Sequence, residues 1–271
     1  MNATLLIPWF RFEPVAVEVA QHELVVYPFQ AAMLFGVIVA LIMAFLFAQE
    51  NRRPLKITAD FALHALVFAF PISLLFNGIF YQPETVRRLF DNPGAISDIS
   101  FGWSSYGGVL GGIVGAFFWK WRRGGSILEI GDSFAFGGPF GWFVGRLGCF
   151  AVHDHPGRVS DFVLAVADYQ VGPQPWAPRH DLGLYDAIVL LCLSFVFLFA
   201  ARKRRPPGFY FGLLGLLYAP ARFLLDFLRA PYAEGGDLRY AGLTPSQYVS
   251  IGFFIAGVVL LRRLRTTARE P

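Results

Sequence analysis

Residues 145–158 place charged and titratable side chains at the end of an apolar segment. The stretch reads Gly-Arg-Leu-Gly-Cys-Phe-Ala-Val-His-Asp-His-Pro-Gly-Arg. Arg146 lies in its apolar part, where a charge is costly unless it is paired, solvated through a cavity or bound to an anion. Arg222 lies within a later apolar segment and raises the same question. Two guanidinium groups at one depth would suit a phosphate, whose oxygens accept paired N–H donors.

A structural ion pair is the simpler alternative for both arginines. Asp226 follows Arg222 at i+4 and would be its neighbour on a helical face. Asp154 could neutralise Arg146 in the same way. Intramembrane arginines are nevertheless candidates for functional sites by default, and a lipid phosphate is the anion available at that depth. We therefore expect Arg146 to bind the phosphate, and Arg222 either to bind it or to form a gate paired with Asp226.

His153, Asp154 and His155 lie together just beyond the apolar segment. Two histidines at this spacing could ligate a metal, but no third ligand stands nearby in the sequence, so we expect no metal and no cofactor. The histidines are then either solvated loop residues, or a general base or orienting group just outside the membrane, because histidine titrates near neutral pH.

Further candidates are tyrosines at helix ends, together with glycines and a cysteine. Tyr27 and Tyr106 could simply belong to an interfacial aromatic belt. Gly107 and Gly108 follow Tyr106 and would allow close approach of a ligand or a neighbouring helix. Cys149 lies in an apolar run, where a cysteine more often packs than reacts.

The composition indicates a polytopic helical membrane protein. Of the 271 residues, 55% are hydrophobic and only 15% are charged, which is too few charges to cover a soluble domain. Seven apolar segments are long enough to be membrane helices: 25–48, 58–81, 104–120, 131–151, 183–201, 208–228 and 245–262. The net charge of +4 does not indicate nucleic-acid binding, because the basic residues cluster in short loops between these segments. Residues 1–24 show no pattern of a removable signal peptide.

The distribution of basic residues predicts the orientation. Alternate loops carry the larger share of the lysines and arginines: 52–56, 120–123, 202–205 and 262–269. By the positive-inside rule these loops are cytoplasmic, so the amino terminus lies outside and the carboxyl terminus inside. We therefore expect a single integral membrane domain over 1–271, all-α, with longer outer loops, including 152–182, forming a small head. Arg146, Arg222, Tyr27, Tyr106 and Tyr218 would then converge at the outer leaflet.

At this point the chain resembles the bacterial phosphatidylglycerol–prolipoprotein diacylglyceryl transferase family over nearly its whole length. Gly145-Arg146-Leu147-Gly148 and the later Gly157-Arg158 resemble the family signature Gly-Arg-(Ile/Leu)-Gly-Asn-Phe and its following Gly-Arg. Further similar segments, in chain order, are Tyr27, Ser105-Tyr106-Gly107-Gly108, Asp132 with Pro139, Pro178-Arg179-His180 with Leu184-Tyr185-Asp186, Tyr218-Ala219-Pro220-Ala221-Arg222 with Asp226-Phe227-Leu228-Arg229, and Gly242-Leu243-Thr244 with Gln247.

The resemblance implies an enzyme of the bacterial plasma membrane with its active site toward the outer, periplasmic leaflet. It would transfer the diacylglyceryl group of phosphatidylglycerol to the lipobox cysteine of a preprolipoprotein signal peptide, the first step of lipoprotein maturation. The implied catalytic residues are Arg146, Arg222, Tyr106, His153 and Asp154. The implied phosphatidylglycerol-binding residues are Arg146, Tyr27, Tyr218, Gly107, Gly108, Gly157 and Cys149.

Two positions depart from the family pattern. Tyr106 replaces the histidine that precedes Gly-Gly in the family, and Cys149 replaces the asparagine of the signature. His153 or His155 could supply a base from the same outer mouth. The departures also leave open a paralogue with another acceptor, or a non-catalytic phospholipid-binding or transport protein.

Overall fold

The computed structural model describes residues 6–19, 22–92, 103–169 and 176–267. Long helices dominate these residues: α1 (Pro28–Glu50), α2 (Leu55–Phe80), α4 (Ser105–Arg123), α5 (Ile127–Val152), α6 (Leu182–Ala201), α7 (Phe209–Leu225) and α8 (Pro245–Thr267). Each overlaps one of the seven predicted apolar segments. Five of them, α1, α2, α6, α7 and α8, are long and apolar enough to cross a membrane, α7 together with the short 3-10 helix η2 (Asp226–Leu228). The chain is therefore a mostly helical membrane protein.

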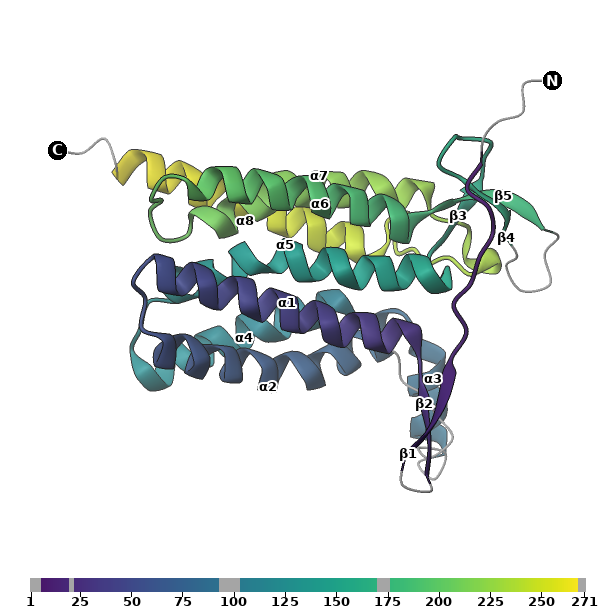
Figure 1. The fold of residues 1–271 in the computed structure, drawn as a ribbon, viewed down its shortest axis with the longest axis horizontal. Coiled ribbons are helices and arrows are strands. Elements are labelled where there is room, and N and C mark those ends of the chain that lie inside the picture. The colour runs from purple at the N-terminus through teal and green to yellow at the C-terminus, as the bar shows by residue number, and fades with distance from the viewer. Residues whose placement is uncertain (1–5, 20–21, 93–102, 170–175, 268–271) are drawn as a thin grey trace.

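Successive long helices run in opposite directions, so their connections lie at two opposite ends of the bundle (Figure 1). The α1–α2, α4–α5 and α6–α7 connections lie at one end, and these carry the basic loops up to residue 205. Arg269 lies outside the described residues. The short helix α3 (Pro83–Asp91), the β-strands and the chain leading to α8 lie at the opposite end.

The prediction of an all-α chain was incomplete, because the end opposite the basic loops also contains two small sheets. β1 (Val15–Val19) and β2 (His22–Val26) form an antiparallel hairpin. β3 (Pro156–Val159), β5 (Ala177–Asp181) and β4 (Val166–Tyr169) form an antiparallel sheet in the order β3-β5-β4. Ile7 pairs with this sheet, its N–H donating to the carbonyl of Ala165 over 3.0 Å. We call residues 6–12, 153–169 and 176–181 the head; residues 170–175 of the predicted outer loop lie outside the described residues.

Helix termini follow from local capping chemistry. The side chains of Ser104, Ser126 and Asp181 accept hydrogen bonds from backbone N–H groups in the first turns of α4, α5 and α6. α4 ends at Gly124, with φ of 73°, and α5 ends at His153, with φ of 52°. A left-handed residue at this position terminates a helix and turns the chain. The turn at His153 thereby directs the chain from the membrane bundle into the head.

Glycines allow the helices to approach closely. On α4, Gly107, Gly111 and Gly115 lie one turn apart, and a Cβ at each would fall within 2.6 Å of α2 atoms. Gly137 and Gly141 of α5 face α1 in the same way. Small residues at such spacing let two helix backbones pack against each other inside a membrane. α2 with α4, and α1 with α5, are therefore tightly packed pairs.

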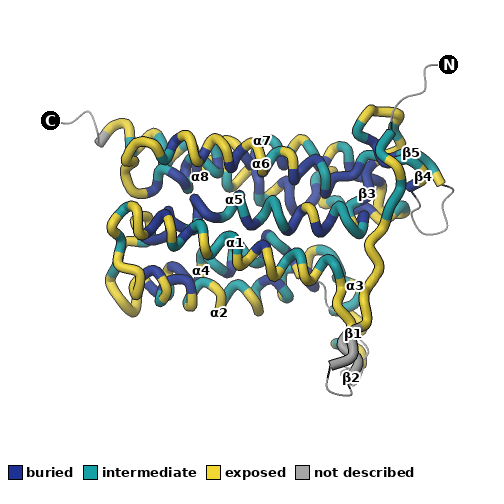
Figure 2. The backbone as a smooth tube through the Cα atoms, in the orientation of Figure 1, coloured by how far each residue is buried: buried dark blue, intermediate teal, exposed yellow. Residues whose placement is uncertain are grey.

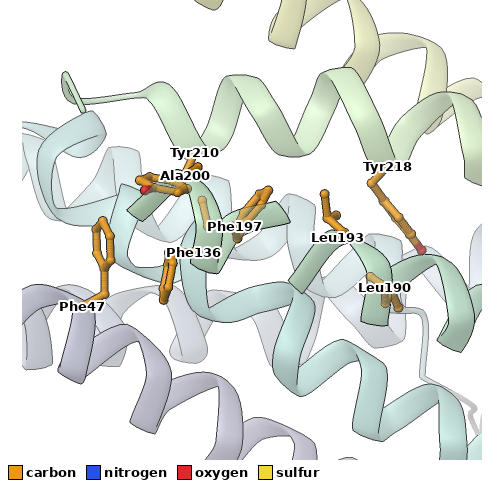
Figure 3. Close-up of a cluster of buried hydrophobic side chains, with 9 residues drawn as sticks. Phe47, Phe136, Leu190, Leu193, Phe197, Ala200, Tyr210 and Tyr218 are labelled. Atoms are coloured by element: carbon orange, nitrogen blue, oxygen red, sulfur yellow. The ribbon is translucent and has the colours of Figure 1, made fainter. Parts of the chain in front are cut away.

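The apolar core lies among α1, α5, α6 and α7. Figure 3 shows its buried side chains, in which the rings of Phe47 and Phe136 stack at 4.3 Å and Tyr210 meets both edge-on. Outward-facing positions of the bundle are mostly exposed (Figure 2). Many are large and apolar, such as Phe70, Phe117 and Phe199, each more than 55% exposed. That pattern fits helices surrounded by lipid.

Candidate active site

A cavity of about 320 Å³ lies at the end of the bundle that adjoins the head. Residues of α1, α2, α4, α5 and α7, together with the chain between α7 and α8, line it. Its charged or titratable lining residues include Arg146, Asp154, His155, Arg222, Arg229 and Asp237. Residues far apart in the sequence thus bring several charged side chains to one space at this end of the bundle.

Arg146 projects into the cavity from α5 and is only 5% exposed. Its Nε lies 2.8 Å from Oδ2 of Asp186 on α6. Its Nη1 lies 3.0 Å from Nε2 of His155 and 3.8 Å from the sulfur of Cys149. The alternative of an ion pair with Asp154 is not the observed arrangement, because the carboxylate that pairs with Arg146 is Asp186 of α6.

Arg222 enters the same cavity from α7 and is 3% exposed. Its Nη1 donates to Oδ1 of Asp226 over 2.6 Å, which is the i+4 pair weighed above. Its Nε lies 3.7 Å from the same Asp186 oxygen that meets Arg146. One carboxylate therefore bridges the two guanidinium groups. Arg222 thus forms the structural ion pair with Asp226 and also lines the cavity.

Asp226 anchors the surroundings of Arg222. Its carboxylate also accepts a hydrogen bond from Nε of Arg229 over 3.3 Å. The hydroxyls of Thr244 and Ser246 donate further hydrogen bonds to it. These partners come from the chain after α7 and from the start of α8. Charge-assisted bonds of this kind fix the position of a side chain, so the end of α7 and the start of α8 hold Arg222 in place.

Asp154 and His155 form a side-chain pair at the mouth of the cavity. Nδ1 of His155 lies 2.5 Å from Oδ1 of Asp154. Burial alone would raise the pKa of the Asp154 carboxyl, but the hydrogen bond from His155 and the positive charge of Arg146 lower that pKa below its usual value. Asp154 is therefore an ionised acceptor at neutral pH.

His153 points away from the cavity, into the head. Its Nδ1 lies 2.7 Å from Oδ2 of Asp181, and its ring stacks on Trp9 at 4.5 Å. Its carbonyl accepts a hydrogen bond from the hydroxyl of Tyr169. The left-handed turn at residue 153 sends His153 and His155 to different surroundings. A direct catalytic role for His153 does not agree with this placement.

Tyr106 and Cys149, the two departures from the family pattern, both line the cavity. Tyr106 is 6% exposed, and within the described residues its hydroxyl has no hydrogen-bond partner. An unpaired buried hydroxyl costs free energy, so it indicates a site where another partner binds. Cys149 is 4% exposed and lies one helical turn from Arg146.

The other two tyrosines predicted to belong to the site, Tyr27 and Tyr218, do not line this cavity. Tyr27 is 49% exposed and lies at a separate hollow of about 210 Å³ with Arg11 and Glu13. Tyr218 is buried behind the arginines, where its hydroxyl donates to Oδ2 of Asp186 over 3.2 Å. Tyr218 thus holds the bridging carboxylate, and neither tyrosine belongs to the lining of the cavity that the two arginines enter.

The three predicted glycines differ from one another. A Cβ at Gly107 would lie 2.5 Å from Cβ of Phe76, so this glycine serves helix packing. Gly157 packs in the head, where a Cβ would lie 2.7 Å from the carbonyl oxygen of His180. A Cβ at Gly108 would meet nothing within 4 Å. Close approach to a ligand is therefore not what Gly107 and Gly157 provide.

Sequence reasoning gave no role to Asp186, Arg229 or Asp237. Asp186 is 1% exposed and organises the centre of the site. The signal for it was present, because a carboxylate inside an apolar segment needs a cationic partner. Arg229 and Asp237, whose side chains lie 3.2 Å apart, come from a connection whose path the sequence does not reveal.

One group among the described residues could offer ligands to a metal. Cys149, Asp154 and His155 each provide a ligand atom, and these atoms lie within 4.8 Å of one another. The set would suit zinc by ligand type. Arg146, however, is already in contact with the His155 nitrogen and the Cys149 sulfur. We therefore assign no metal to this group.

Comparison with known proteins identifies the family. Residues 14–263 match the family model described as prolipoprotein diacylglyceryl transferase. The chain is 35% identical to the phosphatidylglycerol–prolipoprotein diacylglyceryl transferase of Janthinobacterium sp. (strain Marseille), over 68% of each chain. It is 34% identical to the protein of that name from Zymomonas mobilis, over 72% of this chain and 70% of the relative. It is 29% identical to the one from Erythrobacter litoralis, over 76% of each. The chain belongs to the prolipoprotein diacylglyceryl transferase family.

Proposed function

We propose that this protein transfers the diacylglyceryl group of phosphatidylglycerol to the lipobox cysteine of a preprolipoprotein signal peptide. The observation that carries the proposal is the pair of buried arginines, Arg146 and Arg222, facing one cavity and sharing one carboxylate. Family membership supplies the reaction, and the two arginines supply a place for the phosphate.

The reaction displaces a phosphate ester at a glyceryl carbon. The cysteine sulfur forms a bond to that carbon, the carbon–oxygen bond breaks, and glycerol phosphate leaves with the electron pair. Negative charge grows on the leaving phosphate in the transition state. Fixed donors in a site with little water stabilise such charge best. Each guanidinium has five N–H donors, more than the contacts of Arg146 with Asp186 and His155, or those of Arg222 with Asp186 and Asp226, require. Both guanidinium groups thus have capacity for phosphate oxygens.

Tyr106 would complete the phosphate site. Its buried hydroxyl lines the cavity with no hydrogen-bond partner among the described residues. A phenol is neutral near pH 7 and can donate to a phosphate oxygen. In this proposal Tyr106 binds the headgroup, and it is not the base that a histidine would be at the same position. Cys149 would border the same space.

The proposed topology has seven spans, with the glycine-rich α4 and α5 crossing the membrane beside the five apolar helices. The end that carries the basic loops would face the cytoplasm, and the head would face the periplasm. The cavity would then lie at the depth of the outer leaflet, where a phospholipid headgroup and a signal peptide can both arrive. The inner membrane is the bilayer in which both substrates occur.

Reconstitution tests the function directly. The purified protein is incubated in vesicles of phosphatidylglycerol with a lipobox peptide, and mass spectrometry follows the peptide cysteine. We expect a mass gain of one diacylglyceryl group with phosphatidylglycerol and none with phosphatidylethanolamine vesicles. A peptide with serine in place of the cysteine is the control. Absence of product with phosphatidylglycerol would contradict the proposal and would favour another acceptor or a lipid-binding role.

A further inference from the structure

Both ring nitrogens of His155 are occupied, and their partners fix the protonation of the ring. Nε2 lies 3.0 Å from Nη1 of Arg146, and Nδ1 lies 2.5 Å from Oδ1 of Asp154. A guanidinium group has donors only, so Nε2 must be the acceptor in this contact. The remaining nitrogen, Nδ1, then carries the hydrogen and donates it to the Asp154 carboxylate. His155 is thus a neutral imidazole whose basic nitrogen faces the cavity.

His155 is the only histidine lining this cavity among those whose side chains the structure describes. His153 is buried against Trp9 in the head, and His180 bonds to the hydroxyl of Tyr185 over 2.7 Å. His64 contacts the carbonyl of Asp60 near the opposite end of α2. Tyr106 offers a phenol whose ordinary pKa of about 10 makes the neutral group a poor base.

The position of His155 relative to Arg146 suits a base for this reaction. The carbon under attack is bonded directly to a phosphate oxygen, so the incoming thiol must approach the phosphate site. Nε2 of His155 already lies within hydrogen-bond distance of the guanidinium assigned to that phosphate. A thiol beside the phosphate would therefore also lie beside Nε2. General bases must be within such reach of the proton that they remove.

We propose that His155 is the general base that deprotonates the acceptor thiol, with Asp154 as its positioning residue. The thiol proton moves to Nε2, and the sulfur attacks the glyceryl carbon as a thiolate, which is the reactive form. The carbon–oxygen bond breaks, and the leaving phosphate takes the electron pair. The imidazolium then returns its proton to that phosphate or to water. Asp154 holds the tautomer and stabilises the imidazolium, as the aspartate does in a hydrolase triad.

This inference rests on the proposed transfer reaction and assigns its base to a residue outside the family signature. It also accounts for Tyr106, because a histidine–aspartate pair, His155 and Asp154, lines the same cavity as Tyr106. Arg146 has a second task in this arrangement. While it donates to Nε2 it keeps that nitrogen unprotonated, and a phosphate that draws its donors away frees the lone pair for the thiol.

The first test compares His155→Gln with His180→Gln, a control in the same head that lies outside the cavity. Initial rates of transfer from phosphatidylglycerol to the lipobox peptide are measured on protein of equal thermal stability. We expect His155→Gln to lose about 10²-fold or more in rate, as removal of a general base typically does. We expect His180→Gln to stay within about twofold. Equal rates for His155→Gln and wild type would overturn the assignment, whereas a wild-type protein that forms no product would overturn the proposed function itself.

Two further variants separate chemistry from folding. Imidazole added to His155→Ala should restore part of the lost rate, because the cavity offers space for a small base where the side chain was. Asp154→Asn should lower the rate by about tenfold or more, and Asp154→Glu should recover most of it. The double variant Asp154→Asn with His155→Gln should be no slower than His155→Gln alone, because the two residues act as a unit.

A metal mechanism makes the opposite predictions. If Cys149, Asp154 and His155 held zinc, a chelator would abolish transfer by the wild type, and added zinc would restore it. We expect transfer to be insensitive to the chelator. Loss on chelation with recovery on zinc addition, or a failure of imidazole to rescue His155→Ala, would overturn the general-base proposal.

Discussion

At the scale of single residues, the centre of the site is an arrangement of charges that cancel only partly. Asp186 lies between Arg146 and Arg222, and the hydroxyl of Tyr218 donates a hydrogen bond to the same carboxylate. The bridge keeps two like charges close together before substrate binds. Without it, each guanidinium would repel the other in a medium of low dielectric constant. The two guanidinium groups are therefore already in place before a phosphate binds.

Arg146→Lys tests the geometry of that site while keeping its charge. Lysine lacks the planar fork that can bind two phosphate oxygens at once. We expect the transfer rate to fall more than tenfold, equivalent to about 1.4 kcal/mol, with expression unchanged. Arg158→Lys, an exposed change in the head, is the matched control and should have no effect. Near-normal transfer by Arg146→Lys would exclude a phosphate role for this side chain.

Tyr106→Phe separates binding from folding at one of the two departures from the family pattern. The hydroxyl bonds to nothing in the described protein, so its removal should leave the melting temperature unchanged or slightly raised. If the hydroxyl donates to the headgroup, the Michaelis constant for phosphatidylglycerol should rise about fivefold to tenfold. Kinetics at varied lipid fraction in mixed micelles measure this. A lower melting temperature with normal kinetics would assign the hydroxyl to folding.

The sequence indicated the two arginines, but it did not indicate which of the two histidines lines the cavity. His153 and His155 are equivalent by type and spacing, and only the positive φ at His153 sends them in different directions. Backbone conformation of a non-glycine residue in the left-handed region is uncommon and is not encoded in a local pattern. Asp186 was visible as a carboxylate in an apolar segment, but its partners come from two other helices.

At the scale of elements, a buried carboxylate positions the start of α7. Asp132 of α5 accepts hydrogen bonds from the backbone N–H groups of Gly208, Tyr210 and Phe211 over 3.0 to 3.1 Å. It therefore acts as an N-cap supplied by another helix. The first N–H groups of a helix have no partner within it, and a carboxylate there also meets the positive end of the helix dipole. α7 carries Arg222 at its other end, so this cap fixes the helix that bears the arginine.

Asp132→Asn should weaken this cap without touching the cavity. We expect a loss of about 1–2 kcal/mol in the free energy of unfolding, within the range measured for N-caps. Thermal unfolding in detergent, monitored by circular dichroism, would show it as a lower melting temperature. Asp161→Asn, an exposed change in the head, should leave the melting temperature unchanged. A stable Asp132→Asn protein would mean that the cap contributes little.

The glycines of α4 provide a matched pair for testing helix packing. A Cβ at Gly111 would lie 2.5 Å from the carbonyl oxygen of Phe68, whereas one at Gly112 would meet nothing within 4 Å. Gly111→Ala should separate α4 from α2 and strongly lower the melting temperature. Gly112→Ala should be neutral or stabilising by up to about 1 kcal/mol, because alanine favours a helix over glycine. Equal effects of the two changes would contradict the packing of α4 on α2.

Helix existence was predictable at this scale, and the small elements of the head were not. Apolar runs mark long helices directly, and Figure 1 shows a helix at each of the seven. The strands β3, β4 and β5 are four or five residues long and mix polar with apolar residues. Ile7 of the amino-terminal segment pairs with Val166 of β4, so the sheet also includes a contact with a distant part of the chain. Such short strands are specified by tertiary contacts more than by propensity.

At the scale of the whole molecule, the cavity with its charged side chains lies at one end of the bundle. The basic loops lie at the other end (Figure 1). The cavity adjoins the head, while Arg52 and Arg204 lie in connections at the opposite end and Arg122 lies in the last turn of α4 there. Lipid phosphate and an exported peptide can meet only at a membrane surface, so the cavity must lie near one. The positive-inside rule predicts that this surface is the outer one, which is the side where an exported acceptor cysteine becomes available.

Cysteine labelling tests the orientation with residues at the two ends. Asp161 is exposed in the head, and Arg204 is exposed in the α6–α7 connection. In a Cys192→Ser background, which leaves only the buried Cys149, Asp161→Cys should react with a membrane-impermeant maleimide in intact spheroplasts. Arg204→Cys should react only after lysis, because a cytoplasmic loop is shielded by the bilayer. The reverse pattern would place the cavity on the cytoplasmic side, where an exported acceptor does not arrive, and would remove the topological support for the proposed reaction.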